Sequence, residues 1–534
     1  MLDEKLSFKE HINYTKNIST SNLNKIKDLY EKHFGLPTHL ALELYNSYVR
    51  TIIESSYMCW ATIPEQDLDK IESIQGQALN SIMKISGKVS YNALDVEAGI
   101  LPIKIRLKQI LAQFGIKILR KAESNPIKQI MVKNLNRENI GKSATIADKI
   151  RMAMTNLTKN KINPLNIEPE TAVHLVQISK IERNLFIWKG FGNASTRTEA
   201  QKEKMRATVE NFLNTINTTD ITCFTDGSVI NPDKHGLGKC GAGVAIYTKS
   251  LRNEPLILSK HVSNSSSSYH GELYAIKIAL QKCLTINLVK VKIIHILSDC
   301  QSAILSSTNN KIADGHQEEI NEICKIAEIL HNRGIKVSIS WIGGHNGIEG
   351  NNLADHAAKK GAALASTNKI DKITLKTAKK AILESAMEHW QKKWNYSETG
   401  SHLKAIQPTV SLGNSSKCLK SRPAQIALHH AKIGRSNLNN QDPINKKEFQ
   451  EKLCLHCNVP EDTEHYFLQC QRYESQRRTM FLAIESTLNE KNIPRKMLRN
   501  NLNFLSENKD LSKSTREQIL YAIELFLRET KRLL

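Results

Sequence analysis

The sequence contains no apolar run of about 18 residues, the length that a helix needs to cross a bilayer. We therefore expect no membrane partner. The N-terminus, MLDEKLSFKEHI, has acidic residues early and lacks the apolar core of a secretory signal, so we expect an intracellular protein, in the nucleus or the cytoplasm. Without secretion, the ten cysteines are expected as thiols or metal ligands and not as a disulfide framework.

Positive charge is the main bias of the composition. The chain has 534 residues, enough for about three domains. It carries 75 Lys and Arg against 53 Asp and Glu, a formal net charge of +22. Basic residues near phosphates release condensed counterions, so a surplus of this size favours a nucleic acid partner. The alternative is a solvated basic surface without such a partner.

The N-terminal part of the chain has the pattern of helices. Apolar residues at helical spacing follow Pro37, Glu65 and Pro102, so residues 1–130 are predicted to be a helical region. Residues 131–217 are lysine-rich and weakly periodic, which predicts a partly helical linker.

The pattern changes at residue 218. Five segments between residues 218 and 365 have the pattern of strands: ITCFTD, GAGVAIYT, PLILSKHV, VKIIHILS and VSISWI. Helices alternate with strands in the second half of this region, which predicts an α/β sheet with at least one parallel crossover. We expect Gly241, Gly243 and the KHGLGKCG stretch to form a hairpin turn.

The C-terminal part returns to helical patterns. Trp390 and Trp394 are four residues apart and are expected to share one helix face. Ser514 and Glu517 have the spacing of a capping box, which predicts the start of the last helix.

Four acidic residues stand in settings that suit metal-dependent chemistry. Asp226 and Asp299 each close an apolar strand, Glu272 opens a helix, and Asp355 lies on the first turns of the last helix of this region. Hydrolysis of a phosphodiester requires stabilisation of an attacking and a leaving oxygen, which two Mg²⁺ ions about 4 Å apart provide through carboxylate ligands. Each acid alone is an ordinary surface residue, and Asp299 alone suits a helix N-cap. The combination predicts a nuclease.

The motifs around these acids resemble those of a known family. FTDGS, GELYAI, SDCQSA and WIGGHNGIEGNNLAD, in this order, resemble the type 1 ribonuclease H domain over residues 218–365. The resemblance implies a mixed five-stranded sheet flanked by helices and cleavage of the RNA strand of an RNA–DNA hybrid. It also implies two Mg²⁺ ions, with Mn²⁺ as the alternative, bound by Asp226, Glu272, Asp299 and Asp355.

Four further residues enter through the same resemblance. His345, in the loop before Asp355, is expected to aid proton transfer or product release. Asn351 matches an asparagine that contacts the substrate backbone in relatives. Gly227 and Ser228 are expected to allow close approach of the hybrid, because a residue without Cβ leaves room. The alternative for the last three is ordinary turn chemistry.

A cysteine–histidine cluster follows near the C-terminus. Cys454, Cys457, His465 and Cys470 have the spacing C-x2-C-x7-H-x4-C, and four such ligands suit tetrahedral Zn²⁺. The spacing departs from the retroviral zinc knuckle, so zinc binding is better supported than nucleic acid binding by this unit. The alternatives are a chance cluster of free thiols, or His456 as the ligand in place of His465.

The order of these parts resembles the C-terminal part of a non-LTR retrotransposon polyprotein. Residues 1–130 resemble the thumb and connection of its reverse transcriptase, and a zinc cluster follows its ribonuclease H domain. Such polymerases use a Tyr-x-Asp-Asp loop, and this chain contains no Asp-Asp dipeptide. We therefore expect a chain that lacks the polymerase palm, from a truncated copy or a gene model opened at an internal Met.

The sequence thus predicts a metal-dependent endonuclease acting on RNA–DNA hybrids, and the alternative is a nucleic-acid-binding remnant without turnover. The predicted parts are a helical region (1–130), a linker (131–217), the ribonuclease H domain (218–365), a helical linker (366–450), a zinc-binding unit (451–475) and C-terminal helices (476–534).

Overall fold

The computed structural model describes residues 7–31, 35–55, 57–137, 145–159, 163–170, 181–184, 198–233, 236–248, 254–308, 315–344, 347–364, 371–413, 418–441, 448, 450–489, 502–506 and 511–534. These residues form two compact units. The first comprises Met1–Gly115, Lys133–Asn160 and Ala381–Leu534, and the second comprises Ile116–Val132 and Lys161–Lys380.

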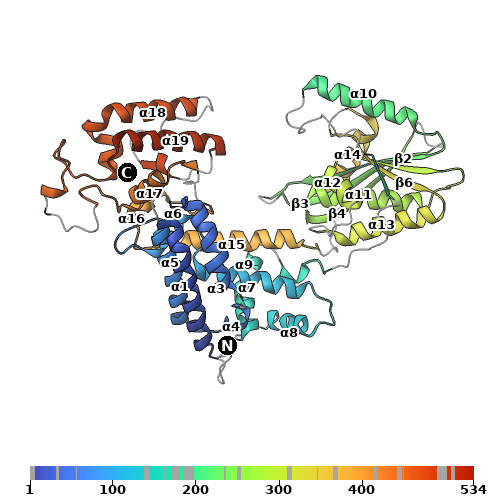
Figure 1. Ribbon diagram of the computed structural model, residues 1–534. Coiled ribbons are helices and arrows are strands. Elements are labelled where there is room, and N and C mark those ends of the chain that lie inside the picture. The colour runs from blue at the N-terminus through green and yellow to red at the C-terminus, as the bar shows by residue number, and fades with distance from the viewer. Residues whose placement is uncertain are drawn as a thin grey trace. The chain divides into compact units, whose positions relative to one another are not determined.

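The first unit is built from helices and short connecting turns (Figure 1). Its N-terminal helices are α1 (Lys9–Glu31), α2 (Thr38–Leu44), α3 (Thr51–Glu54), α4 (Tyr57–Trp60), α5 (Glu65–Ile82), α6 (Tyr91–Ala98), α7 (Ile103–Leu119) and α9 (Ile146–Lys159). A π-helical turn, Tyr45–Arg50, joins α2 to α3. Helices therefore follow Pro37, Glu65 and Pro102, as the apolar spacing predicts. Among the described residues no helix combines the length and hydrophobicity that crossing a membrane requires.

The C-terminal helices of this unit contribute to two apolar clusters, one of which contains Trp390 and Trp394. They are α15 (Leu375–Asn395), α16 (Ser401–Ile406), α17 (Arg422–Ile433), α18 (Glu474–Asn489) and α19 (Lys513–Thr530). Trp390 and Trp394 both lie on α15 and are buried together, as predicted. The cap of α19 differs from the prediction: Ser512, and not Ser514, is the N-cap, and its hydroxyl accepts a hydrogen bond from the Thr515 N–H.

The second unit is organised around a mixed six-stranded sheet of order β1-β6-β5-β2-β3-β4. Its strands are β1 (Ile181–Asn184), β2 (Ile221–Ile230), β3 (Gly238–Tyr247), β4 (Leu256–Ser266), β5 (Ile293–Ser298) and β6 (Lys336–Trp341). Strand β3 pairs antiparallel with β2 and β4, and the pairs β2–β5, β5–β6 and β1–β6 are parallel. All five predicted strands are present, and β1 adds a sixth at the edge from the predicted linker.

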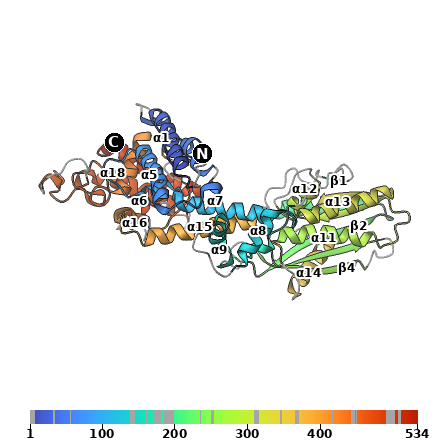
Figure 2. The ribbon, with the colours of Figure 1, turned by 90° about the horizontal axis from the view of Figure 1, so that it is seen from below.

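Helices cover both faces of this sheet. The helices of the second unit are α8 (Pro126–Leu135, which ends in the first unit), α10 (Glu199–Thr215), α11 (Ser268–Cys283), α12 (Gln301–Thr308), α13 (Gln317–Asn332) and α14 (Glu349–Ala363). Helix α14 packs against β2, β3 and β4, whereas α11 packs against the opposite face and against α13. Figure 2 shows α13 and α14 on the two sides of the sheet. The acids on β2, α11 and α14 are therefore brought to one sheet from two layers.

The glycines of β3 were predicted at a turn but lie inside the strand. The β2–β3 connection lies at residues 231–237, whereas Gly241 and Gly243 pair with Ser228 and Asp226 of β2. A Cβ at Gly241 would lie 2.1 Å from the backbone N of Ala362, and one at Gly243 would lie 2.0 Å from the carbonyl of Ala354. Both glycines therefore permit the backbone of α14 to approach the sheet, which is a packing role.

Candidate active site and metal centres

Sheet pairing places Asp226 beside Asp299. Strands β2 and β5 are parallel neighbours, with Thr225 opposite Ser298. The next residue in each segment is an aspartate, so the two carboxyl groups start from adjacent positions, Asp226 within β2 and Asp299 directly after β5. The prediction that Asp226 ends its strand is wrong, because β2 continues to Ile230 through its pairing with β3.

Close packing of α11 on β2 brings in the third acid, Glu272. A Cβ on Gly227 would lie 2.3 Å from the backbone N of Glu272 and 2.6 Å from the carbonyl of Ser268. Because Gly227 has none, the first turns of α11 rest directly on the strand. The space at this glycine is thus filled by α11, and its predicted role in substrate approach stays a prediction.

The carboxyl groups of Asp226, Glu272 and Asp299 converge. Each offers an oxygen, and these oxygens all lie within 4.8 Å of one another. Asp226 and Glu272 are buried, and Asp299 is half-buried. The surroundings hold this arrangement: the Ser298 hydroxyl donates to Glu272 Oε2 over 3.4 Å, and the Trp341 indole N–H donates to the Asp299 carbonyl over 2.9 Å. Three acids far apart in the sequence therefore share one site.

The acids in this site disfavour each other's charge. Burial, with the nearby charge of Asp299, raises the pKa of Asp226 to about 7. Burial and the charge of Asp226 raise the pKa of Glu272 well above its usual range. A cation bound among them would remove this repulsion, and carboxylate oxygens are the ligands that hard cations such as Mg²⁺ prefer. The residues present therefore fit a divalent metal.

Asp355 lies beside this group and is not among the three converging acids. It is on the second turn of α14, where its Oδ2 forms an ion pair with Lys359 Nζ at 2.6 Å. The charge of Asp355 contributes to the raised pKa of Asp226, so the two carboxyl groups are within electrostatic reach. The structure therefore places the fourth predicted acid at the border of the site, paired with a lysine.

Of the three remaining residues predicted at this site, two lie in the described part of the chain. His345 lies outside the described residues. Asn351 is buried on α14, and its Oδ1 has no hydrogen-bond partner in the part of the chain that the structure describes. Ser228 is half-buried on β2 opposite Gly241. Sequence reasoning missed the supporting contacts of Ser298 and Trp341; the only signal for them is their position at the ends of β5 and β6.

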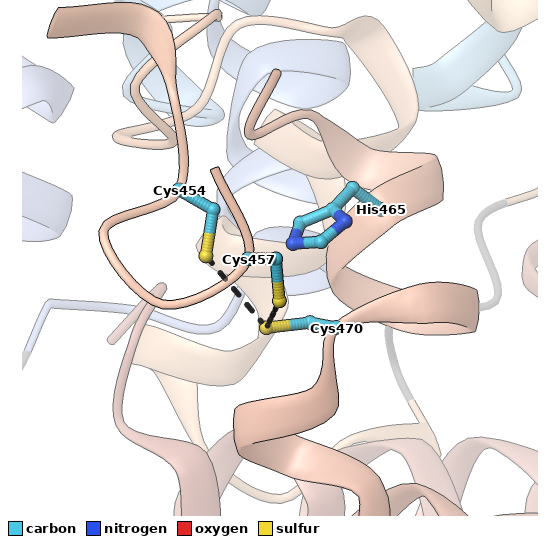
Figure 3. Close-up of side chains that lie close together, drawn as sticks. All are labelled: Cys454, Cys457, His465 and Cys470. Carbon is cyan, nitrogen blue, oxygen red and sulfur yellow. Dashed lines mark hydrogen bonds between the residues drawn. The ribbon is translucent and has the colours of Figure 1, made fainter. Parts of the chain in front are cut away.

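The four predicted zinc ligands come together in the first unit (Figure 3). The Sγ atoms of Cys454 and Cys457 each lie 3.9 Å from Sγ of Cys470, and all four ligand atoms lie within 4.8 Å of one another. His465 is buried, and neither of its ring nitrogens has a hydrogen-bond partner within the described residues. Three thiols and a buried imidazole without a partner fit tetrahedral Zn²⁺. His456, the rival ligand, is exposed and outside this group.

Local backbone contacts form this cluster. The Cys454 N–H donates to the Val459 carbonyl over 2.7 Å, and Asn458, at φ 55°, turns the chain between them. The N–H of Gln471 donates to Cys457 Sγ over 3.4 Å. Burial raises the pKa of the Cys470 thiol to about 12, so this sulfur keeps its proton unless a cation replaces it.

Comparison with known proteins identifies the domain that carries the acids. Residues 218–363 match the family model described as RNase H. This RNase H domain contains the three converging acids and Asp355, while the cysteine–histidine cluster lies outside it. No curated protein matches the chain.

Several solved structures are similar to the RNase H domain. LC11-RNase H1, isolated from compost by a metagenomic approach, is 19% identical, with 27% of this chain and 96% of that chain covered and a TM-score of 0.22. RNase H1 from the archaeon Halobacterium salinarum is 15% identical, with coverage of 27% and 96% and a TM-score of 0.20.

The prototype foamy virus protease-reverse transcriptase is 22% identical, with 28% of this chain and 22% of that chain covered and a TM-score of 0.23. Another structure shows LC11-RNase H1 in complex with an RNA/DNA hybrid. Because these TM-scores are low, the assignment of the domain rests on the family match.

Proposed function

We propose that this protein is a metal-dependent endonuclease that hydrolyses the RNA strand of RNA–DNA hybrids. The observation that carries the proposal is the convergence of Asp226, Glu272 and Asp299, two of them buried, within an RNase H domain. Acidic side chains that are buried close together repel one another, so such a cluster is typical of a functional site. The hybrid is proposed as the substrate because the matched family is RNase H, and LC11-RNase H1 has been solved in complex with an RNA/DNA hybrid.

In this proposal Asp226, Glu272 and Asp299 hold Mg²⁺, or Mn²⁺ in its place, and Asp355 completes a second position once Lys359 releases it. When bound, these ions stabilise the charge on the attacking and leaving oxygens of the phosphodiester. Ser298 holds the carboxyl group of Glu272 in place, and Trp341 holds the backbone of Asp299. The raised pKa of Asp226 keeps it partly protonated until the cation binds.

Substrate contacts are assigned to the border of the site. Asn351, whose buried Oδ1 has no hydrogen-bond partner among the described residues, and the half-buried Ser228 are proposed to contact the hybrid backbone beside Gly227. His345 is proposed to aid proton transfer or product release. The net charge of +22 supports binding of a polyanion.

We assign Zn²⁺ to Cys454, Cys457, His465 and Cys470, where it stabilises the surrounding fold. We also propose that the chain derives from the C-terminal part of a retrotransposon polyprotein. The order of a helical region, an RNase H domain and a cysteine–histidine cluster supports this origin. We propose that the domains have the limits predicted from the sequence.

Cleavage of a labelled RNA–DNA hybrid with Mg²⁺ tests the function. Asp226→Asn should cleave at least a hundredfold more slowly than the wild type, because it removes a central metal ligand; this corresponds to about 3 kcal/mol of lost transition-state stabilisation. Glu254→Gln, an exposed acid ahead of β4, is the matched control and should cleave at the wild-type rate.

Equal cleavage by the wild type and Asp226→Asn, or none by either, would contradict the proposal. Hybrid binding measured in parallel separates the alternative function. A protein that binds hybrid in a salt-sensitive manner but never cuts it is a nucleic-acid-binding remnant.

A further inference from the structure

A second group of potential ligands lies in the same unit, away from the acids described above. His270, His316 and Glu319 each offer one ligand atom, and these atoms all lie within 4.8 Å of one another. Both histidines are buried, with exposures of 8% and 4%, and Glu319 is half-buried. Two imidazoles and one carboxylate form a donor set that binds Zn²⁺ and related transition metals.

This group is separate from the carboxylate site although both use α11. His270 is two residues before Glu272, and at 3.6 residues per turn the two side chains point roughly 200° apart on the helix. His316 and Glu319 come from the start of α13, which packs against α11. The group therefore lies between two helices on one face of the sheet.

The outer ring nitrogens of both histidines already have partners. His270 Nδ1 lies 2.9 Å from the hydroxyl of Ser266, and His316 Nδ1 lies 3.1 Å from Oε1 of Glu168. Histidines that bind metals typically donate the second ring N–H to a carboxylate or another oxygen, which fixes the ring and leaves the other nitrogen for the ion. In both residues this leaves Nε2 as the ligand atom.

The inner atoms have the spacing that an ion requires. His270 Nε2 is buried, has no hydrogen-bond partner within the described residues, and lies 3.5 Å from Glu319 Oε1. A tetrahedral Zn²⁺ with bonds of about 2.0–2.1 Å holds its ligand atoms about 3.3 Å apart. The two imidazole rings are stacked, with centroids 3.8 Å apart and planes at 14°. To bind one ion, the rings must turn out of this parallel arrangement until both Nε2 atoms point at it.

His316 is held in an unfavourable backbone conformation. Its φ is 59°, in the left-handed region, which costs a residue with a Cβ about 1 kcal/mol or more. The conformation is maintained from outside α13, because the His316 N–H donates to Glu168 Oε2 over 3.0 Å. Glu168 is itself fixed by its N–H bond to the Ile373 carbonyl. Several contacts thus combine to present His316 to His270.

We propose that His270, His316 and Glu319 bind a divalent transition metal of the Zn²⁺ class, with Ser266 and Glu168 as the partners that orient the two imidazoles. The ion ties α11, which carries Glu272, to α13 and, through Glu168, to a segment outside the matched RNase H residues. The proposal does not depend on the nuclease activity.

Zinc content of the full-length protein tests this site. The protein is equilibrated with Zn²⁺ in the presence of excess Mg²⁺, which occupies the carboxylate site, and is then dialysed. The wild type should retain one equivalent more than Glu319→Gln or His316→Asn; Asn is chosen because it tolerates the left-handed conformation. His331→Asn, an exposed position at the other end of α13, is the matched control and should retain the wild-type amount. Equal zinc content in all four proteins would overturn the proposal.

A second measurement separates this site from the cysteine–histidine cluster. Cys454→Ser should still bind the additional zinc, and its Co²⁺ form should show visible absorption without a thiolate-to-metal charge-transfer band. Addition of Glu319→Gln to this variant should abolish that absorption. If Cys454→Ser alone binds no transition metal, the two histidines and Glu319 form only a hydrogen-bonded and stacked cluster, and the proposal fails.

Discussion

The carboxylate site of the second unit and the cysteine–histidine cluster of the first are opposite kinds of candidate metal centre. Asp226, Glu272 and Asp299 come from two strands and a helix that a large apolar core holds in position. The four zinc ligands come from one short stretch, in which turns and a π-helical segment, His465–Gln469, supply the geometry. We infer that the fold holds the first site together against charge repulsion, whereas the proposed zinc would help to hold the second together.

The largest effect is expected from loss of zinc. Cys457→Ser should lower the stability of the region around the cluster by several kcal/mol, because apparent zinc binding energies in small structural sites reach about 10 kcal/mol or more. Limited proteolysis should then cut within residues 450–534 at least tenfold faster, and a zinc chelator should have the same effect on the wild type. Cys59→Ser, which changes an exposed thiol, is the control. Unchanged resistance after metal removal would show that this cluster, like the carboxylate site, is held by its fold.

An effect of the opposite sign is expected at the carboxylate site. The pKa of Asp226 is raised to about 7 from its ordinary value of 3.8. Protonation of Asp226 therefore stabilises the folded state, an effect that is fully present below about pH 4 and is lost as pH rises through 7. Without divalent cations, Asp226→Asn should therefore be more stable than the wild type at pH 8, by about 2–4 kcal/mol, since one pKa unit corresponds to about 1.4 kcal/mol.

Thermal unfolding in a chelating buffer at pH 5 and pH 8 measures this effect, and the difference between the proteins should shrink at pH 5. Addition of Mg²⁺ should stabilise the wild type more than Asp226→Asn. A variant that is less stable than the wild type at pH 8 in the chelating buffer would show that the acids do not repel one another as described.

The parts that the sequence predicted best are those in which a local pattern decides the structure. Five strands follow from apolar runs, and Asp226 and Asp299 follow from their places in those runs. Strand β1 was missed because it is short, and Ile181 is its only residue with a large apolar side chain. Gly241 and Gly243 were assigned to a turn because the sequence does not show that α14 packs against them.

Contacts between distant segments explain the other differences. Glu168, His270 and His316 are far apart in the chain. The packing of α11 against α13 makes the two histidines neighbours, and contacts with His316 add Glu168. The cysteine–histidine cluster could be predicted because its ligands are close in sequence. The pairing of Asp355 with Lys359, a helical spacing of four residues, was visible in the sequence but did not enter the prediction.

That pair gives the smallest expected effect and addresses the border of the carboxylate site. The Lys359 and Asp355 side chains are 59% and 36% exposed, and ion pairs of this kind contribute about 0.2–1 kcal/mol. Lys359→Met should therefore change the free energy of unfolding by less than about 1 kcal/mol. Because the lysine no longer competes for Asp355, half-maximal cleavage should need about two- to threefold less Mg²⁺, a shift of roughly 0.5 kcal/mol. Lys360→Met, an exposed neighbour, should leave the Mg²⁺ dependence unchanged. If both variants show the wild-type Mg²⁺ dependence, Asp355 takes no part in binding the metal, and the site consists of the three converging acids.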